Sequence, residues 1–172
     1  MTIDPGKLRV VRLLEFPLDV NQRATEAFEG MRREFTLVAM RTPEASDVPT
    51  RLLELITALT DEFEDVGAGP GREGDEALAR GETVLAELVH RVPPSVVPAF
   101  VALNDMCDEA DGYCRQGDVL LSMASPPEAI AFRRWFLGEF TAQVAGQEPL
   151  PWPDADQETL LCDARLRGTF AG

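Results

Sequence analysis

The hydrophobic pattern of the chain predicts both strands and helices. Residues 7–16 are rich in Leu and Val, with apolar side chains on both alternating faces, which is typical of a strand covered on both sides. Residues 83–92 alternate more clearly and predict a second strand. Residues 119–124 predict a short third strand. The apolar side of the second strand is expected to hold Val84, Ala86, Leu88 and Val92.

Four other stretches carry apolar residues at helical spacing and predict helices over about 20–40, 48–65, 95–115 and 127–145. The first follows a capping box at Asp19 and Gln22. The last follows Ser125, two prolines and Glu128, and we expect Ser125 to be its N-cap.

The stretch between the second helix and the second strand is rich in glycine. Residues 66–74 contain GAGPGREG, which predicts a surface loop because Gly and Pro disfavour regular elements. No GK[ST] follows, so the spacing does not match a phosphate-binding loop. A short helical turn over 75–80, ending at Gly81, should precede the strand.

Together these elements predict an α+β fold. We expect a small, mainly antiparallel sheet of three or four strands packed with four main helices, and an all-α bundle is the alternative. The pattern predicts a single domain over residues 1–146 and an extended tail over residues 147–172, which contains three prolines. The order strand, proline, helix occurs at 7–40 and again at 83–115, a faint internal echo.

The charge of the chain narrows the choice of partners. Its 172 residues include 30 Asp and Glu against 16 Lys and Arg, a formal net charge of -14. Such a surface repels nucleic acid and anionic lipid, so neither is expected as a partner. Three cysteines without a CxxC pair indicate a reduced compartment, and no apolar run is long enough to span a membrane. We therefore expect a cytoplasmic protein.

The residues that usually carry catalysis are scarce. His90 is the only histidine and sits on the apolar side of a predicted strand, which favours a packed residue over a base. Cys107 and Cys114 lie in the apolar stripe of the third helix, which favours buried, inert thiols. The sequence predicts no catalytic residue and no cofactor.

An acidic cluster over 105–111 is the nearest approach to a metal site. Asn104, Asp108 and Asp111 share one flank of the third helix, and their oxygens could hold Mg²⁺ or Mn²⁺. In so acidic a chain, a solvated run of acids is the expected alternative. We therefore predict no metal.

Arg133 stands out because it projects from the middle of the apolar arc of the last helix. A buried guanidinium needs an acceptor, and we expect an ion pair with Asp111. If Arg133 is exposed instead, then Arg133, Arg134 and Trp135 would form a cationic and aromatic patch for an acidic partner or a small anion.

Trp152 lies between two prolines on a segment without a predicted helix or strand. Docking into a groove of the same chain is one reading, and anchoring to a partner protein is the other.

The segment DEADGYCRQGDVLLSMASPPEAIAFRRWFLGEFTAQVAG, with the following PLPW and the earlier REFTLVA, resembles a group of short proteins from high-GC bacteria. Genes of that group are associated with genes for anti-sigma factors, STAS-domain antagonists and PP2C-type phosphatases. The resemblance implies a place in stress or developmental signalling and brings no catalytic residue with it.

Two classes of function follow. The first is a non-catalytic protein-interaction module in bacterial regulation, for example in an anti-sigma or stress-response partner switch. The second is a small ligand sensor or enzyme that uses Arg133 and the Asp105–Asp111 carboxylates. The candidate binding residues are Arg133, Arg134, Trp135, Trp152, Asp108 and Asp111. A protein partner is expected, and a homodimer formed through the apolar last helix is possible.

Overall fold

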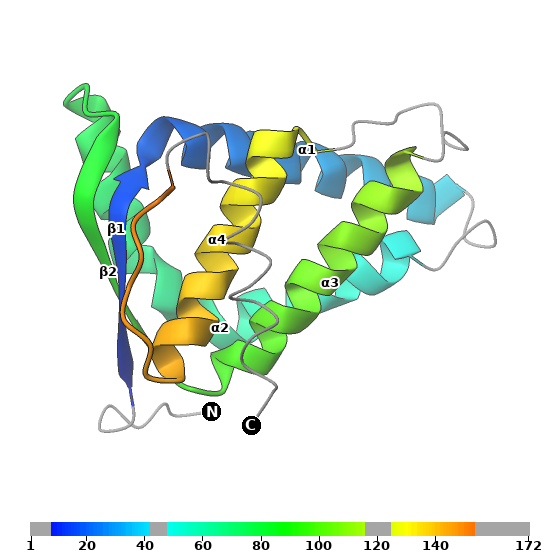
Figure 1. Cartoon of the computed structure of the whole chain (residues 1–172). Coiled ribbons are helices and arrows are strands. Elements are labelled where there is room, and N and C mark those ends of the chain that lie inside the picture. The colour runs from blue at the N-terminus through cyan, green and yellow to red at the C-terminus, as the bar shows by residue number, and fades with distance from the viewer. Residues whose placement is uncertain (1–7, 42–47, 116–124, 154–172) are drawn as a thin grey trace.

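The elements follow one another as strand, helix, helix, and then again as strand, helix, helix (Figure 1). The computed structural model describes residues 8–41, 48–115 and 125–153, and for Arg41 and residues 62–68 it describes the backbone alone. The elements are β1 (Arg9–Pro17), α1 (Leu18–Arg41), α2 (Val48–Ala79), β2 (Val84–Val92), α3 (Val96–Arg115) and α4 (Pro127–Val144).

The fold is α+β and mostly helical, with a two-stranded antiparallel sheet in the described residues. The all-α alternative was therefore wrong. The predicted third strand at 119–124 lies outside the described residues and stays a prediction. The described helices α1 to α4 lie on one side of the sheet (Figure 1). None of the described helices combines the length and hydrophobicity that a bilayer crossing requires.

Among the described residues only one side of the sheet is covered, so the prediction that the first strand is covered on both sides was wrong. Val11 and Leu13 of β1 are fully buried, whereas Val10, the neighbour of Val11, is 49% exposed. On β2 the buried residues Leu88, His90 and Val92 continue this inner side. The opposite side, here called the outer sheet face, is open to solvent.

The alternation of inward-facing and outward-facing side chains shifts by one residue where the ladder of hydrogen bonds is interrupted. The pairing skips Glu15, whose φ of 50° lies in the left-handed region. Beyond this point Phe16 of β1 and its partner Leu85 of β2 point inward. Val84 and Ala86 are consequently exposed, although the alternation in the sequence placed them on the apolar side with Leu88 and Val92.

Two hydrophobic clusters fill the interior. One lies beneath the sheet and joins β1 and β2 to the end of α2 and to α4, with Phe140 almost fully buried at 1% exposure. The other lies among α1, α2 and α3 and includes Leu52 and both Cys107 and Cys114. Much of the apolar surface of α4 is buried within the chain, while Ile130, Phe136 and Val144 are partly buried. A homodimer formed through the last helix stays a prediction.

The glycine-rich stretch is helical, so the predicted surface loop was wrong. α2 continues through residues 66–74 to Ala79 and contains Pro70 in its interior. Interior Pro and Gly cost a helix about 3 and about 1 kcal/mol each relative to Ala. Packing offsets this cost, because Ala77 is fully buried in the sheet cluster and Gly74 lies beside Leu18.

Each set of three elements ends in the same kind of helix cap. Gly81 follows α2, and there the Glu82 amide donates to the Ala77 carbonyl at 3.1 Å. Gly146 follows α4, and there the Gln147 amide donates to the Ala142 carbonyl at 2.9 Å. Both glycines have φ above 80°, as the Schellman motif requires.

The packing repeats as well. α2 packs on β2 and on α3, while α4 packs on β1 and on α1. Exchanging the first set of elements for the second leaves this list of neighbours unchanged. The faint echo in the sequence thus corresponds to an approximate two-fold symmetry of the described fold.

Candidate functional site

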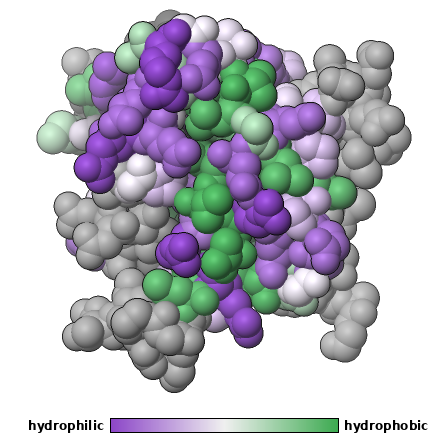
Figure 2. All heavy atoms as spheres, turned by 90° about the vertical axis from the view of Figure 1, so that its left-hand side faces the viewer, coloured by the Kyte–Doolittle hydropathy of each residue, from purple (hydrophilic) through white to green (hydrophobic). Residues whose placement is uncertain are grey.

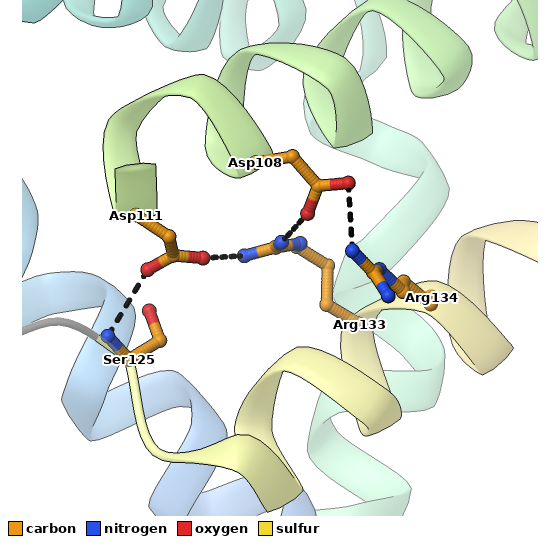
Figure 3. A network of polar contacts seen from close by, with 5 residues as sticks. All are labelled: Asp108, Asp111, Ser125, Arg133 and Arg134. Carbon is orange, nitrogen blue, oxygen red and sulfur yellow. Dashed lines mark hydrogen bonds and ion pairs between the residues drawn. The ribbon is translucent and has the colours of Figure 1, made fainter. Parts of the chain in front are cut away.

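Arg133 crosses from α4 to α3 and ends between two carboxylates (Figure 3). Its Nη1 donates to Asp111 Oδ2 at 3.0 Å, and its Nη2 donates to Asp108 Oδ1. The side chains of Arg133 and Asp111 are 13% and 1% exposed. The predicted ion pair between these two residues is confirmed, and Asp108 is a second partner.

The same two carboxylates hold other groups. Asp108 Oδ2 accepts from Arg134 Nη2 at 3.0 Å, and Asp111 Oδ1 accepts from the backbone amide of Ser125 at 3.0 Å (Figure 3). The N-cap of α4 is Pro126, which makes no side-chain cap bond, so the predicted cap role of Ser125 was wrong. Asp111 instead fixes the chain just before the helix and ties the start of α4 to α3.

The pairing of Asp108 and Asp111 with arginines disfavours a divalent metal ion at these carboxylates. Asp108 and Asp111 face guanidinium groups, and no group of three or more His, Cys, Asp or Glu side chains in the described residues could hold a metal ion. Cations already neutralise the carboxylates that a divalent ion would need. A ligand-sensing or enzymatic role for Arg133 stays a prediction.

The structure separates Trp135 from the two arginines. Trp135 is 4% exposed in the sheet cluster, so the predicted patch of Arg133, Arg134 and Trp135 does not exist on the surface. Trp152 docks against the same cluster, with its ring 5.3 Å from Trp135 and 5.7 Å from Phe132. Docking of Trp152 within its own chain is confirmed.

A buried carboxylate that the sequence analysis missed positions the segment before Trp152. Glu139 is fully buried on α4, and its Oε2 accepts from the Leu150 amide at 3.0 Å and from Gln143 Nε2 at 2.9 Å. The amide of Gln143 in turn bonds both the N–H and the C=O of Arg12. An acidic residue beside Phe140 in an apolar stripe was the signal that could have revealed it.

The residues with nucleophilic or basic potential are buried in apolar surroundings. His90 is 6% exposed between aromatic rings, and burial lowers its pKa to about 4. Burial raises the pKa of the Cys107 thiol to about 11 and also raises that of Cys114. None of these groups meets a partner in the described residues that would activate it for catalysis.

The outer sheet face is the exposed feature that sequence reasoning did not find. Val10, Val84 and Val89 lie on it and are three of the five exposed large hydrophobic residues in the described chain. Figure 2 views this side of the molecule and shows a band of hydrophobic residues bordered by hydrophilic ones. The available signal was the alternation of Val10 and Arg12 with buried neighbours, which the prediction of a strand covered on both sides does not take into account.

Arginines accompany the valines on this face. Val10 is opposite Arg91, and Arg12 is opposite Val89, so the two residue types form a small checkerboard. Arg12 also contacts Glu87 through a hydrogen bond and ion pair, which raises the pKa of Arg12 and lowers that of Glu87. Among the described residues no ion pair engages Arg91 or the nearby Arg9.

Comparisons of the chain with protein-family models, with curated proteins and with solved structures found no match.

Proposed function

We propose that this chain is a non-catalytic protein-interaction module of bacterial regulatory signalling, acting in the cytoplasm, and that it binds its partner through the outer sheet face. The observation that carries the proposal is the exposure of aliphatic residues on that face. Isolated exposed aliphatic residues are ordinary, but three on one small sheet indicate a contact surface.

The charges on the face indicate an acidic partner. The protein carries a net charge of -14, yet the outer sheet face presents Arg12 and Arg91, with Glu87 as the acid that contacts Arg12. A positive region on an acidic protein attracts carboxylates. We therefore assign the face to a protein segment that presents aliphatic side chains beside Asp or Glu.

The burial of the reactive and charged side chains supports a binding role over a catalytic one. The Arg133 network links α3 to α4, and His90 and Cys107 sit in the core. The resemblance to proteins encoded near anti-sigma factors and their antagonists supports a place in regulation.

The test compares two variants that change similarly exposed aliphatic residues in different places. Val10→Glu alters the outer sheet face, whereas Leu37→Glu alters α1 at 45% exposure away from the sheet. We expect a stoichiometric protein to co-purify from the native host with the wild type and with Leu37→Glu. Its affinity for the purified Val10→Glu variant should fall by about tenfold or more, since a charge would replace a buried contact.

The proposal that the partner is acidic is tested separately, by a charge reversal and by added salt. Arg91→Glu should weaken the purified complex by about tenfold as well, and added salt should weaken the wild-type complex. A partner that binds Val10→Glu and Arg91→Glu as tightly as the wild type would overturn the proposal.

A further inference from the structure

The two outer edges of the sheet differ. The edge of β1 is occupied, because the Gln143 side chain bonds Arg12 N–H and C=O at 2.9 Å each, and the Trp152 amide donates to the Leu14 carbonyl at 3.1 Å. On β2, no hydrogen bond among the described residues other than the ladder to β1 engages the backbone of Val89 or Arg91. An unpaired strand edge is a template for another strand.

The direction of the free groups follows from the ladder. In an antiparallel pair, residues alternate between exchanging hydrogen bonds and pointing both backbone groups away from the partner. Arg12 points its groups outward to Gln143, so its partner Val89 points outward from the other strand. By the same period of two, Glu87 and Arg91 present their N–H and C=O groups along the open edge.

α2 leaves room for this pairing because it packs on the inward side of β2. Ala77 of α2 shares the sheet cluster with Leu85 and Leu88, the buried side chains of that strand. The side chains along the open edge point the other way. Val89 is 37% exposed, and Arg91 is exposed as well.

We infer that β2 pairs antiparallel with β2 of a second copy of this chain, centred on Val89, so that two sheets join into one of four strands. The residues in the row are self-complementary. With Val89 opposite Val89 of the partner subunit, Glu87 faces Arg91 of the partner subunit on either side of the two-fold axis. Each copy thus supplies one carboxylate and one guanidinium group to the other.

The register is specific. Centring the pair on Glu87 would place two acids opposite each other, and centring it on Arg91 would place two cations opposite each other, both of which are unfavourable. Glu87 stays anionic because its contact with Arg12 lowers its pKa. Its second oxygen is free of any hydrogen bond in the described structure and can accept from Arg91 of the partner subunit.

This inference does not depend on the acidic partner proposed above. Val10 lies on β1, one strand away from the joined edges, and the outer sheet face remains open in the four-stranded sheet. The dimer would present that face twice. Loss of the dimer and loss of partner binding are therefore measured with different variants, and Arg91 is the one residue substituted in both tests.

The decisive experiment exchanges the charges. Glu87→Arg and Arg91→Glu should each weaken the dimer by about tenfold or more in sedimentation equilibrium, because each pairs like charges. An equimolar mixture of the two variants should recover a heterodimer, since every pair across the joined strands then holds opposite charges again. The controls Glu73→Arg and Arg72→Glu make the same charge changes on exposed residues of α2.

A cross-link tests the geometry directly. Residues that exchange hydrogen bonds across antiparallel strands have Cα atoms about 5.5 Å apart, within the range a disulfide spans. In a chain carrying Cys162→Ser, Val89→Cys should form a dimer on oxidation, whereas Val10→Cys should not. A wild type that stays monomeric at high micromolar concentration, or a variant mixture that fails to associate, would refute the inference.

Discussion

His90 illustrates how a single residue can make stability depend on pH. Its ring packs edge-on against Phe140 and Phe136, with centroids 5.1 and 5.9 Å apart. Neither ring nitrogen has a hydrogen-bond partner in the described structure. The neutral imidazole is therefore strongly favoured in the folded state, and burial lowers the pKa to about 4.

This burial predicts lower stability in acid. Between pH 4 and the ordinary histidine pKa of about 6.5, the imidazole is protonated in the unfolded chain and neutral in the folded chain. The free energy of unfolding should therefore rise with pH by about 3 kcal/mol and then level off. Urea unfolding at a series of pH values measures this slope. His90→Phe should remove most of it and stabilise the protein at neutral pH, because two unsatisfied nitrogens are lost. An unchanged slope in that variant would contradict the assignment.

Asp111 should be the most sensitive residue of the Arg133 network. Asp111→Ala leaves a guanidinium of 13% exposure without its buried partner, and we expect a loss of about 3 to 5 kcal/mol. Asp108→Ala is the matched control, because Asp108 is 36% exposed and should cost about 1 kcal/mol or less.

The double variant Asp111→Leu with Arg133→Met completes this measurement. It removes both charges, so it should recover much of the stability that Asp111→Ala loses. Chemical denaturation of the four proteins gives the comparison. If Asp111→Ala unfolds like the wild type, the pair does not stabilise the fold.

At the scale of elements, the prediction of most helices succeeded because their apolar periodicity is long and strong. α1 and α3 begin and end within a few residues of the expected positions. The prediction for the end of α2 was wrong because Gly and Pro favour a loop locally. The burial of Ala77 and the contact of Gly74 with Leu18, which stabilise the helix, arise only from tertiary packing.

Glycine substitutions distinguish the helix from the predicted loop. A Cβ at Gly71 would meet no atom within 4 Å, so Gly71→Ala should stabilise the protein by about 0.5 to 1 kcal/mol as it would in any exposed helix interior. Gly81 has a φ of 82°, and Gly81→Ala should destabilise by about 1 kcal/mol or more. Thermal unfolding of both variants checks the opposite signs, and a neutral Gly71→Ala would argue for a loop.

At the scale of the molecule, the second helix of each strand-helix-helix set packs on the strand of the other set, and on the first helices of both sets. α4 covers β1 and α2 covers β2, so neither strand-helix-helix set buries its own apolar surface alone. The two hydrophobic clusters are linked through the same helices. We therefore expect the molecule to unfold as one unit.

Matched core deletions test this cooperativity. Phe140→Ala in the sheet cluster and Leu52→Ala in the helical cluster should each cost about 3 to 5 kcal/mol. Both should shift one transition, seen alike by far-ultraviolet and near-ultraviolet circular dichroism. A variant that splits unfolding into two steps would show that the clusters are independent.

Local sequence pattern was enough to predict the helices with strong periodicity and both described strands. It was also enough to predict the burial of His90, Cys107 and Cys114, and the ion-pair partner of Arg133. Each of these follows from local spacing, or from the rule that a buried charge needs a partner. Residues such as Asp111 could be found because the third and fourth helices each present one apolar stripe.

Which faces of the elements stay exposed to solvent depends on how the elements pack together. A strand with apolar residues on both sides does not reveal whether one side meets solvent, and the shift in alternation at Glu15 depends on backbone geometry. Glu139 and Gln143 acquire their roles only when α4, β1 and the segment at Leu150 come together. Contacts between residues distant in sequence fix these features, so no local pattern encodes them.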